Sequence, residues 1–235
     1  MEVVFLGIND AGLRIYEWLC ERESVSVRCL ITTKEQLELI KEIQPEMVIS
    51  AGFDHLVPAE ILDVPQNGCI NLHPSYLPHN RGKSPNVWSI VENTPAGVTL
   101  HFMSESFDEG PIIAQREVES SFADTGKDLH GRLEQEQFEL FTDVWPDIEK
   151  GEIETQPQDD IEGKYHSIDD FKDLCEIDPD AKYTAKGFLD ILRALTFPPF
   201  DNAQIQLDDE IYYIDVDIRT ADEQRDEEDG MISSY

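Results

Sequence analysis

Short apolar runs alternate with segments of helical periodicity along the first 150 residues, and this alternation limits the folds open to the chain. Runs typical of buried strands occupy residues 2–7, 25–31, 47–50, 68–72, 98–102 and 111–118. Helical spacing or a capping residue marks residues 9–19, 34–43, 86–92 and a long segment that begins at Thr125. Strands that alternate with helices predict an α/β fold, in which helices cover both faces of a parallel sheet.

The remaining third of the chain predicts a smaller unit. Thr184 begins a helix that ends near the run FPPF, and two alternating runs around an Asp-Asp pair predict a β-hairpin. The patterns divide the chain into an α/β domain at 1–150, a linker at 151–183, a helix and hairpin unit at 184–220 and an acidic tail at 221–235. One helix and one hairpin are too little to be stable alone. We therefore expect this unit to pack on the first domain or on another subunit, as in a homodimer.

The chain carries a large excess of acidic side chains. It has 50 Asp and Glu residues against 18 Lys and Arg residues, which gives a formal net charge of −32. A surface this acidic repels phosphate backbones, so no nucleic-acid partner is expected. Because the acidic residues are spread along the whole chain, we interpret them as a solvated surface adapted to high salt. Binding of a basic partner is an alternative only for residues 222–229.

The sequence predicts neither a membrane anchor nor an export signal. No run approaches eighteen apolar residues, and the first residues form a strand pattern without preceding basic residues. The cysteines are scattered and lack the spacing of a metal site; they are Cys20, Cys29, Cys69 and Cys175. We expect a cytoplasmic protein with reduced thiols, without a membrane partner and without a bound metal.

The loop at residues 71–85 holds the side chains best suited to chemistry. Its sequence, NLHPSYLPHNRGKSP, directly follows an apolar strand, where α/β proteins carry their functional residues. Asn71 and His73 lie two residues apart and therefore on the same side of a strand. Together with Asp108 they offer an amide, an imidazole and a carboxylate, a set that suits acyl transfer to an amine. The alternative is a histidine with a purely structural role at a strand end.

A second loop, GINDAG, follows the first strand. It lacks the full GxGxxG pattern, and no acidic residue is clearly placed to bind a ribose, so binding of NAD is not supported. A helix N-terminus can nevertheless bind phosphate. Together with Arg14 and Lys83, the backbone amides of Ile8, Asn9 and Asp10 are therefore candidates for holding the phosphates of a substrate.

The loop at residues 71–85 resembles the signature of the 10-formyltetrahydrofolate-dependent formyltransferase family. That pattern has Asn-x-His, then a Ser, Leu-Pro, Arg-Gly and a later Asp-x-Gly. The matching residues are Asn71, His73, Ser75, Leu77, Pro78, Arg81, Gly82, Asp108 and Gly110. The resemblance covers about residues 1–150, including the segment AGFDHLVPAEIL, and the run from Asn71 to Met103 is most similar to nucleotide-sugar N-formyltransferases.

The resemblance implies a Rossmann-like formyltransferase domain with a small helix and hairpin extension. It implies that Asn71, His73 and Asp108 are catalytic, with Asn71 and His73 holding the oxyanion and either His73 or Asp108 as the base. The residues expected to contact folate are Ala51, Gly52, Phe53, Leu56, Val57, Ser104 and Phe107. The residues expected to contact the acceptor are Asn9, Asp10, Ser75, Lys83 and Asn86.

The implied reaction is formyl transfer from 10-formyltetrahydrofolate to a primary amine, and the local similarity favours a nucleotide-linked deoxyamino sugar. The first alternative is a methionyl-tRNA formyltransferase, which the net charge and the short region between residues 31 and 47 disfavour. Further alternatives are a non-catalytic folate-binding or scaffold protein and an acyltransferase that uses another donor.

The sequence also suggests roles for the other basic residues of this region and for three further histidines. Arg81 is expected to brace the loop through backbone carbonyls. Lys83 can attract a phosphate or the glutamate tail of folate. We expect His55, His79 and His101 at the surface or in packing.

The charge distribution predicts that salt stabilises the protein. Repulsion between exposed carboxylates is screened within a Debye length of roughly 3 Å at 1 M salt. The melting temperature, followed by circular dichroism, should therefore climb as salt is raised to the molar range. A flat or falling curve would contradict a salt-adapted surface and favour a specific basic partner.

Overall fold

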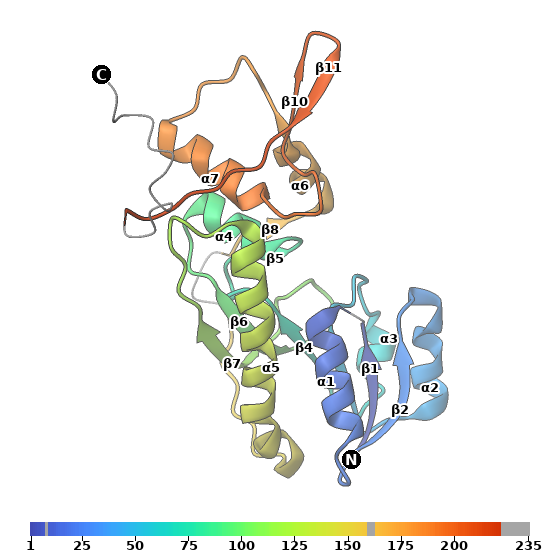
Figure 1. The fold of residues 1–235 in the computed structure, drawn as a ribbon. Coiled ribbons are helices and arrows are strands. Elements are labelled where there is room, and N and C mark those ends of the chain that lie inside the picture. Colours follow the sequence, from blue (N-terminus) through green and yellow to red (C-terminus); the bar gives the residue numbers. More distant parts are fainter. Residues whose placement is uncertain (8, 159–162, 222–235) are drawn as a thin grey trace, which may run out of the picture.

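The computed structural model describes residues 1–7, 9–158 and 163–221, and it contains a large α/β domain joined to a smaller C-terminal unit (Figure 1). The strands of the large domain are β1 (Glu2–Leu6), β2 (Ser26–Ile31), β3 (Met47–Ala51), β4 (Cys69–His73), β5 (Arg81–Gly82), β6 (Gly97–Phe102) and β7 (Ile112–Glu117). Its helices are α1 (Asp10–Cys20), the 3₁₀ helix η1 (Lys34–Glu38), α2 (Leu39–Ile43), α3 (Ala59–Leu62), α4 (Pro85–Glu92) and α5 (Gly126–Lys150). The acidic residues 222–235 lie outside the described residues.

Six strands form the central sheet in the order β2-β1-β3-β4-β6-β7. The first four pair in parallel, whereas β6 is antiparallel to both β4 and β7. The predicted α/β fold is confirmed, with the correction that the sheet is mixed. The helix α4, which connects β4 to β6, lies beyond the C-terminal end of β4 (Figure 1). The chain therefore re-enters the sheet from that end and runs in the opposite direction.

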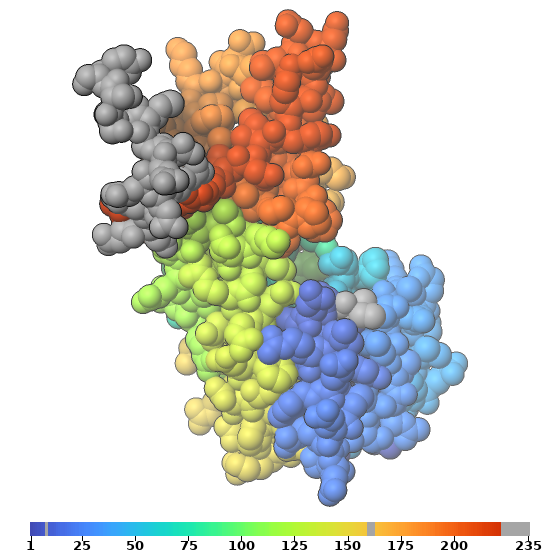
Figure 2. Space-filling model, viewed as in Figure 1, coloured from blue at the N-terminus to red at the C-terminus, as the bar shows by residue number. Residues whose placement is uncertain are grey.

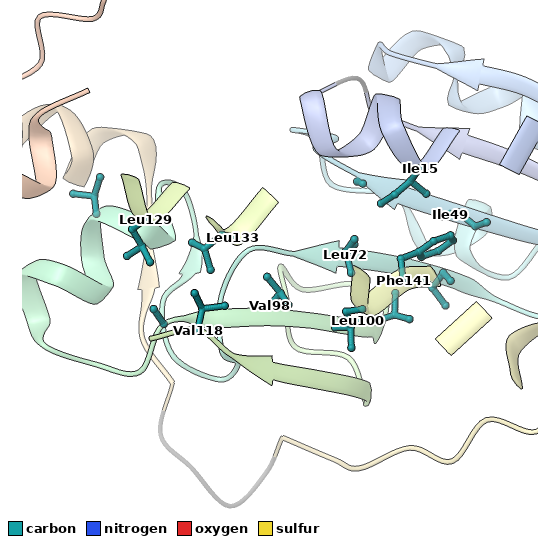
Figure 3. Close-up of a cluster of buried hydrophobic side chains, with 14 of the residues drawn as sticks. Ile15, Ile49, Leu72, Val98, Leu100, Val118, Leu129, Leu133 and Phe141 are labelled. Carbon is teal, nitrogen blue, oxygen red and sulfur yellow. The ribbon is translucent and has the colours of Figure 1, made fainter. Parts of the chain in front are cut away.

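Two hydrophobic clusters cover the two faces of this sheet. On one face, α1 and α5 pack against the central strands, and Leu129 and Phe141 of α5 are fully buried (Figure 3). On the other face, Leu37 and Ile40 pack against Val4 and neighbouring strand residues. The predicted helix at 34–43 is present, but it consists of η1 followed by α2, and the geometry changes from 3₁₀ to α-helical at Leu39. Both faces of the central sheet are thus covered.

The C-terminal unit contains more structure than the sequence predicted. Its elements are β8 (Tyr165–His166), α6 (Ile168–Cys175), β9 (Glu176–Ile177), α7 (Ala185–Leu195), β10 (Gln204–Leu207) and β11 (Glu210–Tyr213). The segment 151–183, predicted to be a linker, thus contains the helix α6. Ser167 and Asp170 form a capping box at the start of this helix. The predicted hairpin is formed by β10 and β11.

The first turn of α5 and the end of α7 hold the two parts of the molecule together. A Cβ atom at Gly126 would clash with the backbone carbonyl of Ala194, so only glycine permits this close approach. Helix α7 also packs against α4. The C-terminal unit therefore lies beyond α4 and the first turns of α5 (Figure 1).

Candidate active site

A cavity of about 430 Å³ lies between the α/β domain and the C-terminal unit. Figure 2 shows a hollow at this boundary, between the orange C-terminal unit and the blue N-terminal segment. The α/β domain contributes Asn9, Gly52, Phe53, Asn71, His73, Lys83, Asn86, Phe107, Asp108 and His130, among others. The cavity is therefore placed where α/β folds bind their ligands, at the C-terminal ends of parallel strands.

A smaller cavity adjoins the first. Its lining includes Leu56, Val57, His101, Met103 and Ser104. Four residues line both cavities, namely Phe53, Asn71, Phe107 and Asp108. Two reactants bound in the two cavities would thus meet at Asn71 and Asp108.

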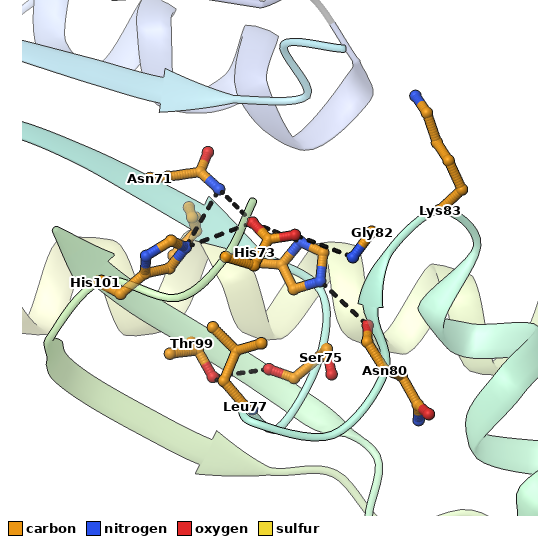
Figure 4. A network of polar contacts seen from close by, with 12 residues as sticks. Asn71, His73, Ser75, Leu77, Asn80, Gly82, Lys83, Thr99 and His101 are labelled. Carbon is orange, nitrogen blue, oxygen red and sulfur yellow. Dashed lines mark hydrogen bonds and ion pairs between the residues drawn. The ribbon is translucent and has the colours of Figure 1, made fainter. Parts of the chain in front are cut away.

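Asn71, His73 and Asp108 lie together where these cavities meet, and Figure 4 shows Asn71 and His73 in this polar network. His73 Nδ1 lies 3.6 Å from Asp108 Oδ1, and the amide nitrogen of Asn71 lies 3.4 Å from the same oxygen. The second carboxylate oxygen of Asp108 accepts a 2.9 Å hydrogen bond from the backbone N–H of Gly82. The alternation of β4 aligns Asn71 with His73, as the sequence predicted, and the loop after β6 brings Asp108 to them.

Burial and charge keep Asp108 ionised. Burial raises the pKa of this carboxyl group, but the neighbouring His73, the His101 ring and the Gly82 N–H lower it more, so its pKa lies well below the ordinary value. A carboxylate with so low a pKa is a weak base at neutral pH. Asp108 is thus better suited to orient an imidazole than to accept a proton.

Burial has the opposite consequence for His73. The ring is 7% exposed, and this burial lowers its pKa below the ordinary value, although Asp108 and the carbonyl of Asn80 act in the other direction. The Asn80 oxygen lies 3.3 Å from Nε2 of His73. His73 is therefore neutral at pH 7 and able to take up a proton.

His101 belongs to this network, which corrects the expectation that it lies at the surface or in packing. Its ring is 2% exposed, and its Nδ1 lies 2.7 Å from the carbonyl oxygen of Phe102. That carbonyl can only accept, so Nδ1 carries hydrogen and Nε2 of a neutral ring can accept from Asn71, 3.3 Å away. The antiparallel pairing of β4 with β6 places His101 directly opposite Asn71. His101 therefore orients the amide of Asn71.

The residues predicted to contact folate fall into two groups. Gly52, Phe53 and Phe107 line the larger cavity, and the smaller cavity is lined by Phe53, Leu56, Val57, Ser104 and Phe107. Ala51 ends β3 with its side chain fully buried in the core, and it lines neither cavity. The lining of the smaller cavity combines apolar and aromatic side chains with polar ones, a mixture that fits one edge of a heteroaromatic ring such as a pterin.

Three of the five residues predicted to contact the acceptor line the larger cavity, namely Asn9, Lys83 and Asn86. Asn9 caps α1 through a 2.7 Å hydrogen bond from the Gly12 N–H, and Asn86 donates to the carbonyl of Gly126. Asp10 faces solvent in the first turn of α1. Ser75 is buried inside its loop, where its hydroxyl donates to the His79 carbonyl. The structure thus brings neither Asp10 nor Ser75 to the cavity.

The basic residues of the region are already paired with acceptors. Lys83 forms an ion pair with Asp54. Arg14 donates to Gln135, 3.0 Å away, and its guanidinium lies over the ring of Phe138. Arg81 donates to the side chains of Glu109 and Gln158, which corrects the expectation that it contacts backbone carbonyls. Ile8, the remaining phosphate candidate, lies outside the described residues.

The cavity also has a wall that the sequence did not predict. It is formed by Tyr165, Phe171, Ala194, Phe197, Phe200 and Asn202 of the C-terminal unit. Phe197 and Phe200 belong to the run FPPF, and two aromatic residues in a loop were the available sequence signal. Their approach to the catalytic loop depends on long-range packing, which the sequence pattern does not contain.

Two negative findings concern the described residues. Among residues 1–7, 9–158 and 163–221, no group of three His, Cys, Asp or Glu side chains could hold a metal ion. Within the same ranges, no helix has both the length and the apolar character needed to span a bilayer.

The fold and the site together define a Rossmann-like transferase whose amide, imidazole and carboxylate groups lie between two binding cavities. Residues 15–145 match the family model described as formyl transferase, and residues 170–220 match the N-formyltransferase dimerization C-terminal domain. The chain therefore belongs to the formyl transferase family.

Curated relatives carry two kinds of name. The chain is 35% identical over 158 residues to the dTDP-4-amino-4,6-dideoxyglucose formyltransferase of Mycobacterium bovis, which covers 67% of this chain and 66% of the relative. It is also 35% identical over 136 residues to a methionyl-tRNA formyltransferase from a Geobacillus species, which covers 57% of this chain. The chain spans only 43% of the length of that tRNA enzyme.

Solved structures extend the similarity over the whole chain. A sugar N-formyltransferase from a Shewanella species is 28% identical, with a TM-score of 0.84 over 94% of this chain and 98% of the other. A formyltransferase from Anoxybacillus kamchatkensis is 32% identical, with a TM-score of 0.63 over 74% of this chain and 89% of the other. That structure is a complex with UDP-4,6-dideoxy-4-formamido-L-AltNAc and tetrahydrofolate.

The burial of His73 predicts an unusual titration. Because burial lowers its pKa, the imidazole should stay neutral below pH 6.5 and protonate only at lower pH. The ring signals of His73, assigned by comparison with His73→Gln, should therefore shift with a midpoint below pH 6.5. A midpoint at or above pH 6.5 would contradict the assignment of a neutral, buried base.

Proposed function

We propose that this protein transfers the formyl group of 10-formyltetrahydrofolate to the primary amine of a nucleotide-linked deoxyamino sugar. One observation carries the proposal: two cavities meet at Asn71 and Asp108, beside a buried neutral imidazole. In the reaction, a bond forms between the amine nitrogen and the formyl carbon, and the bond from that carbon to N10 of the folate breaks. The amine loses one proton and N10 gains one.

His73 is the residue that removes the amine proton in this proposal. Its lowered pKa leaves the ring unprotonated at neutral pH, whereas the pKa of Asp108 is too low for efficient proton uptake. The negative charge of Asp108 then stabilises the imidazolium that forms 3.6 Å away. Of the two alternatives that the sequence left open, the proposal thus takes His73 as the base.

Asn71 stabilises the charge that develops on the formyl oxygen. Its amide nitrogen makes two long contacts in the resting site, 3.3 Å to His101 and 3.4 Å to Asp108. Contacts of this length cost little to loosen, so one N–H can turn toward the formyl oxygen when the substrates are bound. The predicted role of Asn71 as an oxyanion donor is compatible with this geometry.

The acceptor lies in the larger cavity, and the reacting end of the folate lies where the two cavities meet, because the smaller cavity of about 40 Å³ has room for only part of a pterin ring. Phe53, Leu56, Val57 and Phe107 offer the apolar contacts that a pterin ring requires. The larger cavity has room for a sugar near Asn71 and, farther out, aromatic rings of Phe197 and Phe200. Asn9, Lys83 and Asn86 supply polar contacts between these ends.

Three observations favour a nucleotide sugar over a tRNA. A nucleotide sugar has few phosphates, and Lys83 could exchange its partner Asp54 for one of them. A tRNA needs many phosphate contacts, which a chain with a net charge of −32 is poorly suited to make. The matched region also covers 66% of the sugar enzyme but only 43% of the tRNA enzyme. The methionyl-tRNA reaction remains the alternative.

Panels of acceptors test this function. We expect formylation of an amino-sugar nucleotide with 10-formyltetrahydrofolate, and no formylation of methionyl-tRNA under the same conditions. The reaction should continue in the presence of a chelator, because no metal has a role in the proposal. His73→Ala, Asn71→Ala and Asp108→Ala should each lower kcat by about a hundredfold or more, whereas His79→Ala, in the same loop, should not.

The product analysis can also reject the proposal. Formyl-methionyl-tRNA without any formylated sugar nucleotide would assign the protein to the tRNA reaction. Near-normal turnover by a folded His73→Ala variant would remove His73 from its role as the base.

We further propose that the protein is a cytoplasmic, salt-adapted homodimer. The match to a dimerization domain at residues 170–220 and the exposed apolar side chains of the hairpin, Leu207, Ile211, Tyr212 and Tyr213, support a subunit contact there. The free thiols of the four cysteines support a reducing compartment. Sedimentation at 1 M salt should give twice the chain mass, and cell fractionation should place the protein in the cytoplasm; a monomer or a membrane-bound fraction would contradict these assignments.

A further inference from the structure

Gln158 lies under the loop that carries Asp108, in a part of the chain that neither family match covers. Its side chain amide donates to the carbonyl oxygen of Asp108 at 3.0 Å and to that of Gly110 at 2.7 Å. Its own oxygen accepts a 2.9 Å hydrogen bond from Arg81. Gln158 is 8% exposed, so water has little access to these groups. All of its side-chain hydrogen-bonding atoms are therefore engaged with the catalytic loops.

The backbone turn that Gln158 contacts has a conformation that few residues adopt easily. Asp108 has a φ of 55°, a left-handed conformation that non-glycine residues rarely adopt. Gly110 packs so tightly that a Cβ atom there would clash with the carbonyl of Phe102. Both carbonyl groups at which Gln158 donates belong to this turn, and buried carbonyls without donors are costly. The amide of Gln158 thus stabilises the conformation that aims the Asp108 carboxylate at His73.

Gln158 is itself held in place by the backbone next to it. Two residues earlier, the backbone of Gln156 exchanges hydrogen bonds of 2.7 and 2.8 Å with Ile112 at the start of β7. Arg81, which donates to the Gln158 oxygen, is fixed through its own backbone N–H, which donates to the Lys164 carbonyl at 2.8 Å. Gln158 is therefore held by the backbone pairing of Gln156 and by its hydrogen bond with Arg81.

We propose that Gln158 is a positioning residue for formyl transfer, which acts by holding the Asp108 turn at the distance from His73 that catalysis requires. The proposal rests on the proposed function in one respect, because it takes Asp108 to be a catalytic residue. A displacement of a catalytic group by about 1 Å can cost up to a hundredfold in rate. Gln158 would not touch either substrate, so its loss should change kcat and leave both KM values nearly unchanged.

Gln158→Glu isolates the donor role of the amide. The glutamate keeps the length of the side chain and can still accept from Arg81, but it removes both donors and faces the two carbonyls with a carboxylate. We expect kcat for the amino-sugar nucleotide to fall about ten- to a hundredfold, with KM for both substrates within about twofold. Gln156→Glu is the matched control, since it adds the same charge two residues away on an exposed side chain, and it should keep the kcat of the unmodified protein.

Two further measurements separate positioning from a merely structural role. In an Asp108→Asn background, Gln158→Glu should cause no additional loss of kcat, because the residue acts through Asp108. In folded Gln158→Leu, the ring of His73 should titrate at a lower pH than in the unmodified protein, because the displaced carboxylate no longer favours the charged ring. This second measurement needs no substrate and remains decisive if formyl transfer itself is not observed.

Several results would overturn the proposal. They are an unchanged kcat in folded Gln158→Glu, an equal loss in the Asp108→Asn background, or an unchanged titration of His73 in Gln158→Leu. Failure of both Gln158 variants to fold would assign the residue to stability and not to positioning. Absence of turnover in the unmodified protein with every acceptor would count against the proposed function alone.

Discussion

The carboxylate of Asp108 lies almost entirely out of water, and a charge in that position is stable only if neighbouring groups compensate it. The nearest donors come from separate parts of the chain, the amide of Asn71 on β4 and the backbone N–H of Gly82 on β5, and the rings of His73 and His101 lie beside the carboxylate. The loop at residues 71–85 and the β4–β6 pair must therefore hold one arrangement for this charge to remain buried. The same charge keeps His73 in reach of protonation, since burial alone would lower its pKa further. The geometry of the site and the stability of the surrounding loops thus both depend on the ionised carboxylate of Asp108.

The overall charge and the local charge of this protein have different consequences. A net charge of −32 acts over the whole surface, but salt screens exposed charges beyond about 8 Å at physiological ionic strength. Inside the cavity, an anionic substrate meets only the nearest groups, and Lys83 is there in a pair with Asp54. A few phosphates can be bound by exchanging such a partner, whereas an extended polyanion would cross the acidic surface. The net charge therefore disfavours a large polyanionic ligand, but it does not prevent the binding of a small anionic one.

The parts of the site that follow from short-range pattern were predictable. The alternation of β4 aligned Asn71 with His73, Asp108 completed a set that suits acyl transfer, and the family resemblance pointed to the same three residues. His101 was missed because its role depends on the antiparallel register of β6 against β4, which local sequence does not determine. Gln158 lies in a segment that the sequence indicated only as a linker, since one buried glutamine has no periodic signal. The mixed sheet was missed for a related reason: strand patterns do not contain strand direction.

The acceptor end of the cavity depends on the contact between the two parts of the molecule. Arg193 of α7 is 6% exposed and donates to the carbonyl of Asp124, 2.9 Å away, and to that of Ser121, 3.1 Å away. Its charge is compensated by the buried carboxylate of Asp190, 2.8 Å from its Nε. Removing one partner of such a pair leaves an uncompensated buried charge, so this contact is sensitive to the loss of either residue. Ala194 directly follows Arg193, Phe197 comes three residues later, and both line the cavity, so Arg193 ties this cavity wall to the segment before α5. The α/β domain thus supplies the polar groups between the two cavities, and the position of α7 sets the shape of one wall of the larger cavity.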